Sequence, residues 1–77
     1  MDPVNESATA PREVLEKRYT ILQYFKYEHL PEKLKAVSQP FCDIAYEMAA
    51  SLPYNPETSA GLRKLLEAKD CAVRAAL

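Results

Sequence analysis

The residues best suited to chemistry gather in residues 24–31, which read YFKYEHLP, and Lys33 and Lys35 follow shortly after them. Aromatic rings stack on nucleobases, and lysines neutralise phosphates. The start of a following helix also offers free backbone N–H groups to an anion. This combination favours a small nucleotide over a long polymer as ligand. The alternative is that the aromatic rings belong to the core and the lysines to a solvated face.

The sequence contains no set of residues for nucleophilic catalysis, because no serine or cysteine has a base at suitable spacing. His29 is the only histidine, and a lone histidine is more often a capping or hydrogen-bonded residue than a catalyst. Cys42 and Cys71 form no C-x-x-C, so they do not predict a metal site. We expect both cysteines to be buried small apolar residues in a reducing cytoplasm. No catalytic residue, metal or cofactor is therefore predicted.

Two pairs of carboxylates suggest a different chemistry. The pairs are Asp43 with Glu47 and Glu67 with Asp70. On an antiparallel hairpin they would bind magnesium and hydrolyse a nucleoside triphosphate. They resemble the E-x-x-E and E-x-x-D pairs of the all-α nucleoside triphosphate pyrophosphohydrolases, although residues 43–47 miss the first pattern. The alternative is a solvated face on which Lys64 and Lys69 pair with the carboxylates.

Length and charge limit the possible classes of protein. A chain of 77 residues forms one domain with a marginal core. Disulfides and metals are unsupported, so we expect partner subunits to supply the missing burial. Ten basic residues against eleven acidic ones give no strongly basic face for a nucleic acid polymer. No apolar run approaches the roughly 20 residues that a membrane span needs, so no membrane partner is predicted.

Apolar residues spaced by three and four predict an all-α fold. Residues 1–10 are expected to be a flexible arm, and residues 11–77 a single helical hairpin domain. The expected helices cover residues 12–27, residues 31–52, and a third segment capped by Thr58 or Ser59 that runs to the end. The short proline-containing loop makes the last two helices antiparallel. The middle helix contains Pro40, expected to kink it, and a predicted inward seam made of Leu34, Val37, Phe41, Ile44, Met48 and Leu52.

Residues 24–77 resemble the small phage proteins that defeat CBASS and Thoeris immunity, which are cyclic-nucleotide sponges sharing a helical hairpin domain. Four features carry the resemblance in order. An aromatic-x-Tyr with His and Pro opens the motif, and an apolar helix follows it. A proline-containing turn comes next, at residues 53–56. A last helix patterned Leu-x-x-Leu…Glu-Ala closes the hairpin at residues 62–68, which read LRKLLEA.

The resemblance implies a non-enzymatic protein in the cytoplasm of an infected bacterial host. It would bind cyclic di- or trinucleotides and withhold them from their effectors without cleaving them. Family members are homo-hexamers with pockets between protomers, and anti-Thoeris members bind cyclic ADP-ribose isomers instead. One pocket would use the opening motif, and a second would use a basic residue of the last helix. The ligand-binding residues expected from this resemblance are Tyr27, His29, Lys33, Lys35, Lys26, Arg74 and Arg63.

Overall fold

The computed structural model describes residues 11–77, and the predicted flexible arm, residues 1–10, lies outside the described part of the chain. The described residues form the α-helices α2 (Arg12–Arg18), α3 (Glu32–Ser51) and α4 (Pro56–Ala76), together with the 3-10 helix η1 (Thr20–Phe25). No strand occurs among them, so the all-α prediction is confirmed. Within residues 11–77 no helix combines the length and the apolar character that a bilayer span requires.

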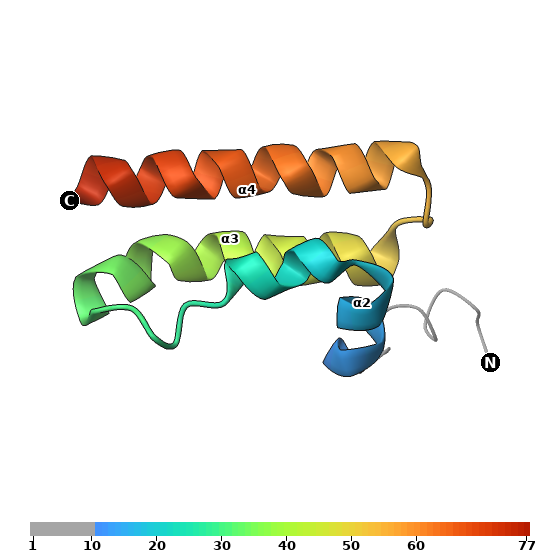
Figure 1. Cartoon of the computed structure of the whole chain (residues 1–77), viewed down its shortest axis with the longest axis horizontal. Coiled ribbons are helices and arrows are strands. Elements are labelled where there is room, and N and C mark those ends of the chain that lie inside the picture. Colours follow the sequence, from blue (N-terminus) through green and yellow to red (C-terminus); the bar gives the residue numbers. More distant parts are fainter. Residues whose placement is uncertain (1–10) are drawn as a thin grey trace.

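Helices α3 and α4 form the predicted antiparallel hairpin (Figure 1). The turn between them is fixed by local hydrogen bonds. Asn55 is the N-cap of α4, and its side-chain oxygen accepts a hydrogen bond from the backbone N–H of Thr58 at 3.0 Å. The Thr58 hydroxyl donates to the carbonyl oxygen of Pro53 at 2.7 Å. The predicted caps, Thr58 and Ser59, were wrong, because Pro56 begins the helix and places Asn55 at the favoured capping position.

The predicted continuous helix over residues 12–27 was wrong. Tyr19 has an extended backbone (φ −124°, ψ 91°), which ends α2 and starts the tighter η1. A 3-10 helix has three residues per turn, so Leu22 and Phe25 lie on the same side of it as Tyr19. All three are buried. Sequence spacing of three and four cannot separate this arrangement from one regular α-helix.

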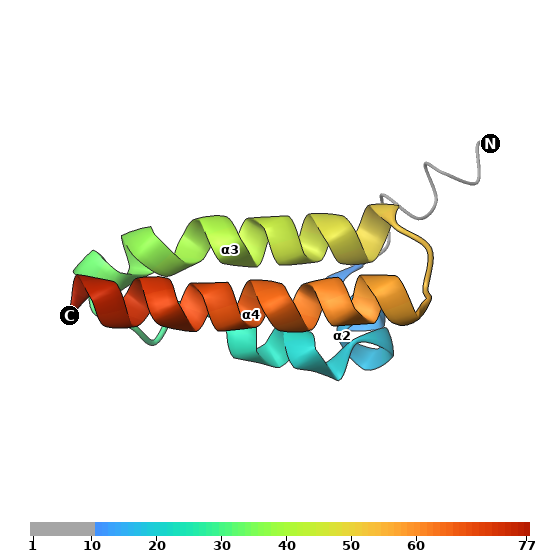
Figure 2. The same cartoon turned by 90° about the horizontal axis from the view of Figure 1, so that it is seen from above.

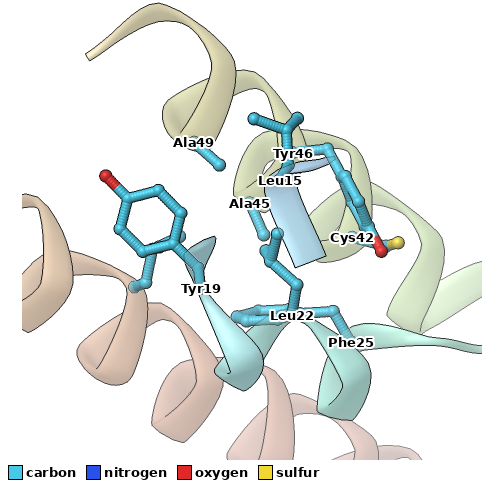
Figure 3. Packing of buried hydrophobic residues seen from close by; sticks show 9 residues of the cluster. Leu15, Tyr19, Leu22, Phe25, Cys42, Ala45, Tyr46 and Ala49 are labelled. Atoms are coloured by element: carbon cyan, nitrogen blue, oxygen red, sulfur yellow. The ribbon is translucent and has the colours of Figure 1, made fainter. Parts of the chain in front are cut away.

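The face that the middle helix buries matches the predicted seam only in part: Phe41 and Met48 are half-buried against the core, but the most buried stripe lies beside them. Its most buried stripe is made of small residues at spacings of four, three and four: Ser38, Cys42, Ala45 and Ala49. The predicted inward residues Ile44 and Leu52 are 47% and 45% exposed. Helix α3 contacts α2, η1 and α4 together, and only small side chains let three elements approach one helix so closely. Figure 3 shows Leu22 and Phe25 of η1 packed against the part of this stripe formed by Cys42, Ala45 and Ala49.

Helix α3 continues through Pro40 to its end at Ser51. The 3-10 helix η1 contacts both α3 and α4. Figures 1 and 2 show it extending along one side of the hairpin. The part of the chain between η1 and α3 then turns back toward the start of α3 (Figure 1). Residues at the end of η1 and in the loop after it therefore lie beside the C-terminal half of α4.

Polar contacts of the Tyr46 side chain link α2 to α3. The Tyr46 hydroxyl donates a hydrogen bond to the Glu16 carboxylate at 2.5 Å. The Arg12 guanidinium lies 4.1 Å from the centre of the same ring, in a cation–π arrangement. Burial of Tyr46, reinforced by the hydrogen bond to Glu16, raises the pKa of its hydroxyl well above the ordinary value. The tyrosine therefore remains a neutral donor throughout the physiological range.

Ser38 provides a test of this packing. It is fully buried, and its hydroxyl has no hydrogen-bond partner among the described residues. An unpaired buried polar group costs about 1–3 kcal/mol. We predict that Ser38→Ala raises the free energy of unfolding by about 1 kcal/mol, measured by urea denaturation at fixed protein concentration.

The matched control is Ser51→Ala. Ser51 is exposed, and its hydroxyl donates to the Glu47 carbonyl oxygen at 2.7 Å, so this change should leave stability equal or slightly lower. A Ser38→Ala protein less stable than the parent would show that the Ser38 hydroxyl has a partner and would refute the assigned packing.

Candidate functional site

One hollow, of about 310 Å³, lies between the C-terminal half of α4 on one side and the end of η1 with the loop after it on the other. We call it the basic cleft. The ionisable residues that line it are Tyr24, Lys26, His29, Lys69, Asp70 and Arg74. Three cationic side chains therefore face this hollow against one carboxylate.

Helix geometry explains the α4 wall of the cleft. Residues separated by three or four positions share one helix face, which brings Lys69, Asp70, Val73 and Arg74 to the same side. Lys69 Nζ lies 3.2 Å from Asp70 Oδ1, so that carboxylate is partly neutralised from within the cleft wall. Lys26 and Arg74 make no ion pair in the described part of the chain, which leaves their charges available to an anion.

The opposite wall is positioned by a buried anchor. Phe25 is completely buried at the end of η1, so its neighbours Tyr24 and Lys26 project from the core. Tyr24 is 59% exposed, and its ring has no aromatic partner within residues 11–77. The loop that carries His29 is held by a turn in which the Leu30 N–H donates to the Tyr27 carbonyl oxygen at 3.0 Å.

Three of the predicted ligand-binding residues meet in the basic cleft. They are Lys26, His29 and Arg74. The family resemblance implied a separate second pocket for Arg74, but the fold places all three residues around one hollow. The cleft also contains Tyr24 and Lys69, which the sequence analysis did not select as site residues. The four-residue spacings of Lys69 with Val73 and of Asp70 with Arg74 are the signal that would have placed these residues on one side of the last helix.

The other predicted residues lie elsewhere in the single chain. Tyr27 is half-buried and packs against the hydrophobic core rather than lining the cleft. Lys33 is exposed at the start of α3. Lys35 lies there too, and its Nζ pairs with Glu32 at 3.3 Å. Arg63 lines a second, smaller hollow of about 180 Å³ beside Tyr19 and Tyr54.

The predicted carboxylate pairs do not assemble. No three histidine, cysteine, aspartate or glutamate residues within residues 11–77 lie close enough together to hold a metal ion. Asp43 and Glu47 are exposed on α3, whereas Asp70 pairs with Lys69 on α4. The described residues of one chain thus form no ligand set of the kind that the pyrophosphohydrolase alternative requires.

The two cysteines differ in environment. Cys42 is buried in the core as predicted, and burial raises the pKa of its thiol. The prediction that Cys71 is buried was wrong, because its side of α4 is exposed. The Arg74 guanidinium lies close to it, with Nη2 3.4 Å from the Cys71 sulfur. Cys71 therefore lies at the edge of the basic cleft, next to Arg74.

Comparison of the chain with protein-family models, with curated proteins and with solved structures finds no match. The resemblance to the sponge family therefore rests on the sequence motifs of residues 24–77 alone.

We predict that only one thiol reacts rapidly with a disulfide reagent in the native protein, because Cys71 is exposed and Cys42 is not. The measurement is the absorbance released by Ellman's reagent, first in buffer and then in guanidinium, where both thiols should react. Cys71→Ser should abolish the rapid phase and keep the slow one. Two rapid thiols, or none, would contradict the assigned burial.

Proposed function

We propose that this chain sequesters cyclic-nucleotide second messengers without cleaving them. It would act as a phage-encoded inhibitor of CBASS-type signalling in the cytoplasm of an infected bacterium. The observation that supports this proposal is the basic cleft, in which an exposed tyrosine ring and three cationic side chains from two segments surround one hollow. No catalytic group and no resident cofactor are required for sequestration.

The cleft has the chemistry that a cyclic nucleotide needs. The exposed ring of Tyr24 offers a stacking surface for a base. Arg74 presents a planar guanidinium that matches two phosphate oxygens at once, and Lys26 supplies a second charge from the facing loop. His29 adds a further hydrogen-bonding group beside them. Charges on two walls suit a ligand that carries phosphates on opposite sides of a ring.

The size of the cleft points to an assembled pocket. Its volume of about 310 Å³ is at the lower end of the roughly 300–1,000 Å³ of small-molecule sites. A ligand with two bases and two phosphates fills more than that, so we propose that a second copy of the chain completes the pocket. Large apolar side chains on one chain are left about half exposed, including Val14, Ile44 and Leu52. Burying them would stabilise a homo-oligomer, for which the family resemblance suggests a hexamer.

The sponge is distinguished from an enzyme by the fate of its ligand. We predict that the protein depletes one or more members of a panel of cyclic dinucleotides, cyclic trinucleotides and cyclic ADP-ribose isomers. Heat denaturation should then release the ligand chemically intact, as measured by chromatography. Depletion should be the same in EDTA and in magnesium. The member depleted separates an anti-CBASS from an anti-Thoeris sponge. Breakdown products, or hydrolysis of nucleoside triphosphates that needs magnesium, would refute sequestration.

Variants then locate the pocket with the depleted ligand. A hydrogen bond to a charged group contributes about 1.5–3 kcal/mol. Arg74→Gln should therefore weaken binding by roughly ten- to hundredfold. Tyr24→Ala should weaken it by about five- to hundredfold through lost stacking. Lys17→Gln removes an exposed charge that lines neither hollow and should have no effect. If Lys33→Gln weakens binding and Arg74→Gln does not, the pocket lies at the start of α3 instead.

A further inference from the structure

The smaller hollow of the described chain differs from the basic cleft in its charge. It measures about 180 Å³ and lies where the junction of α2 and η1 meets the first turns of α4. Its polar lining is Arg18, Tyr19, Thr20, Tyr54, Ser59 and Arg63. We call it the arginine hollow. Ile21 completes the lining, so no carboxylate faces this space.

Within residues 11–77 neither arginine has an ionic partner. Neither Arg18 nor Arg63 makes an ion pair or a side-chain hydrogen bond with another described residue. Arg63 comes from α4 and Arg18 from the end of α2, so the fold itself brings two like charges to one hollow. Two positive charges at one site repel each other. An anion bound between them is attracted to both guanidinium groups and offsets this repulsion.

Tyr19 gives a second, independent indication of a missing partner. Its side chain is only 4% exposed, and its hydroxyl has no hydrogen-bond partner in the described part of the chain. The ring is held in place by Tyr54, edge to face, with ring centres 5.2 Å apart. Figure 3 shows the hydroxyl directed away from Leu22 and Phe25. A buried hydroxyl without a partner is costly, and Tyr19 is one of the residues that line the arginine hollow.

We propose that the arginine hollow binds a phosphate dianion, either free phosphate or the terminal phosphate of a small phosphomonoester. Two guanidinium groups match two negative charges, and each one donates paired hydrogen bonds to phosphate oxygens. The hydroxyls of Thr20 and Ser59 line the same space and add donors for the remaining oxygens. A volume of about 180 Å³ suits a ligand below the size of the cyclic nucleotides proposed for the cleft.

This site is independent of the proposed sponge activity. The arginine hollow and the basic cleft share no lining residue, because one uses Ser59 and Arg63 of α4 and the other uses residues 69–74. The phosphate ligand carries a terminal dianion, whereas a cyclic nucleotide carries only diester monoanions. A test with inorganic phosphate therefore gives an answer whether or not the protein binds cyclic nucleotides.

The test is a titration of the ¹⁵N-labelled protein with sodium phosphate at pH 8, followed by amide chemical shifts. A parallel titration with sodium chloride at equal ionic strength is the reference. We expect saturable shifts around residues 18–21 and 59–63 with phosphate and none with chloride. Arg63→Gln and Arg18→Gln should each weaken phosphate binding at least tenfold. Arg74→Gln, which alters the basic cleft, should leave it unchanged.

Two further titrations, made in the Arg74→Gln background, identify the source of the phosphate. Adenosine monophosphate binding tighter than inorganic phosphate, with adenosine alone not binding, indicates a phosphomonoester ligand. Equal affinity for adenosine monophosphate and phosphate indicates free phosphate, and both results support the site. Shifts that rise linearly without saturation, that are equal in chloride, or that persist in Arg63→Gln would overturn it. Circular dichroism of each variant confirms that the helices are retained.

Discussion

Helix α3 is packed closely by α2, η1 and α4 at once, and this packing determines where the two hollows form. The close packing is possible because Ser38, Cys42, Ala45 and Ala49 present small side chains along the buried stripe. The 3-10 helix η1 packs on this stripe beside α4, with Phe25 completely buried. The two hollows occur at opposite ends of the contact between η1 and α4. Both candidate sites thus follow from one packing arrangement.

The helices could largely be predicted from the sequence, but the face that α3 buries could not. Proline and apolar spacing locate α3 and α4, because these signals are local. The predicted seam through Ile44 was wrong because the positions of large apolar residues do not show where several elements converge on one helix. At such a place small residues, such as Ala45, are the most buried. The break at Tyr19 was also hidden, since apolar residues spaced by three fit both an α-helix and a 3-10 helix.

The sequence predicted which kinds of residue form the candidate site, but not which of them lie together in the fold. Lys26 and His29 stand out locally, because aromatic and basic residues alternate around them. Their meeting with Arg74 depends on how η1 sits against α4, which is a tertiary property. Tyr24 shows the same limit: its ring is solvent-facing only because its neighbour Phe25 is the residue that enters the core. Binding a nucleotide requires charges that converge on its phosphates and a surface on which a base can stack, but it requires no catalytic group.

We propose that copies of this chain assemble and hold a cyclic nucleotide in the basic cleft. The decisive experiment is native mass spectrometry at micromolar protein, with and without the cyclic nucleotide that the protein depletes. We expect a closed homo-oligomer, a hexamer by the family resemblance, that binds ligands in a fixed ratio to its chains and loses them in the Arg74→Gln protein. A monomer that retains no ligand at any concentration of the panel would contradict it.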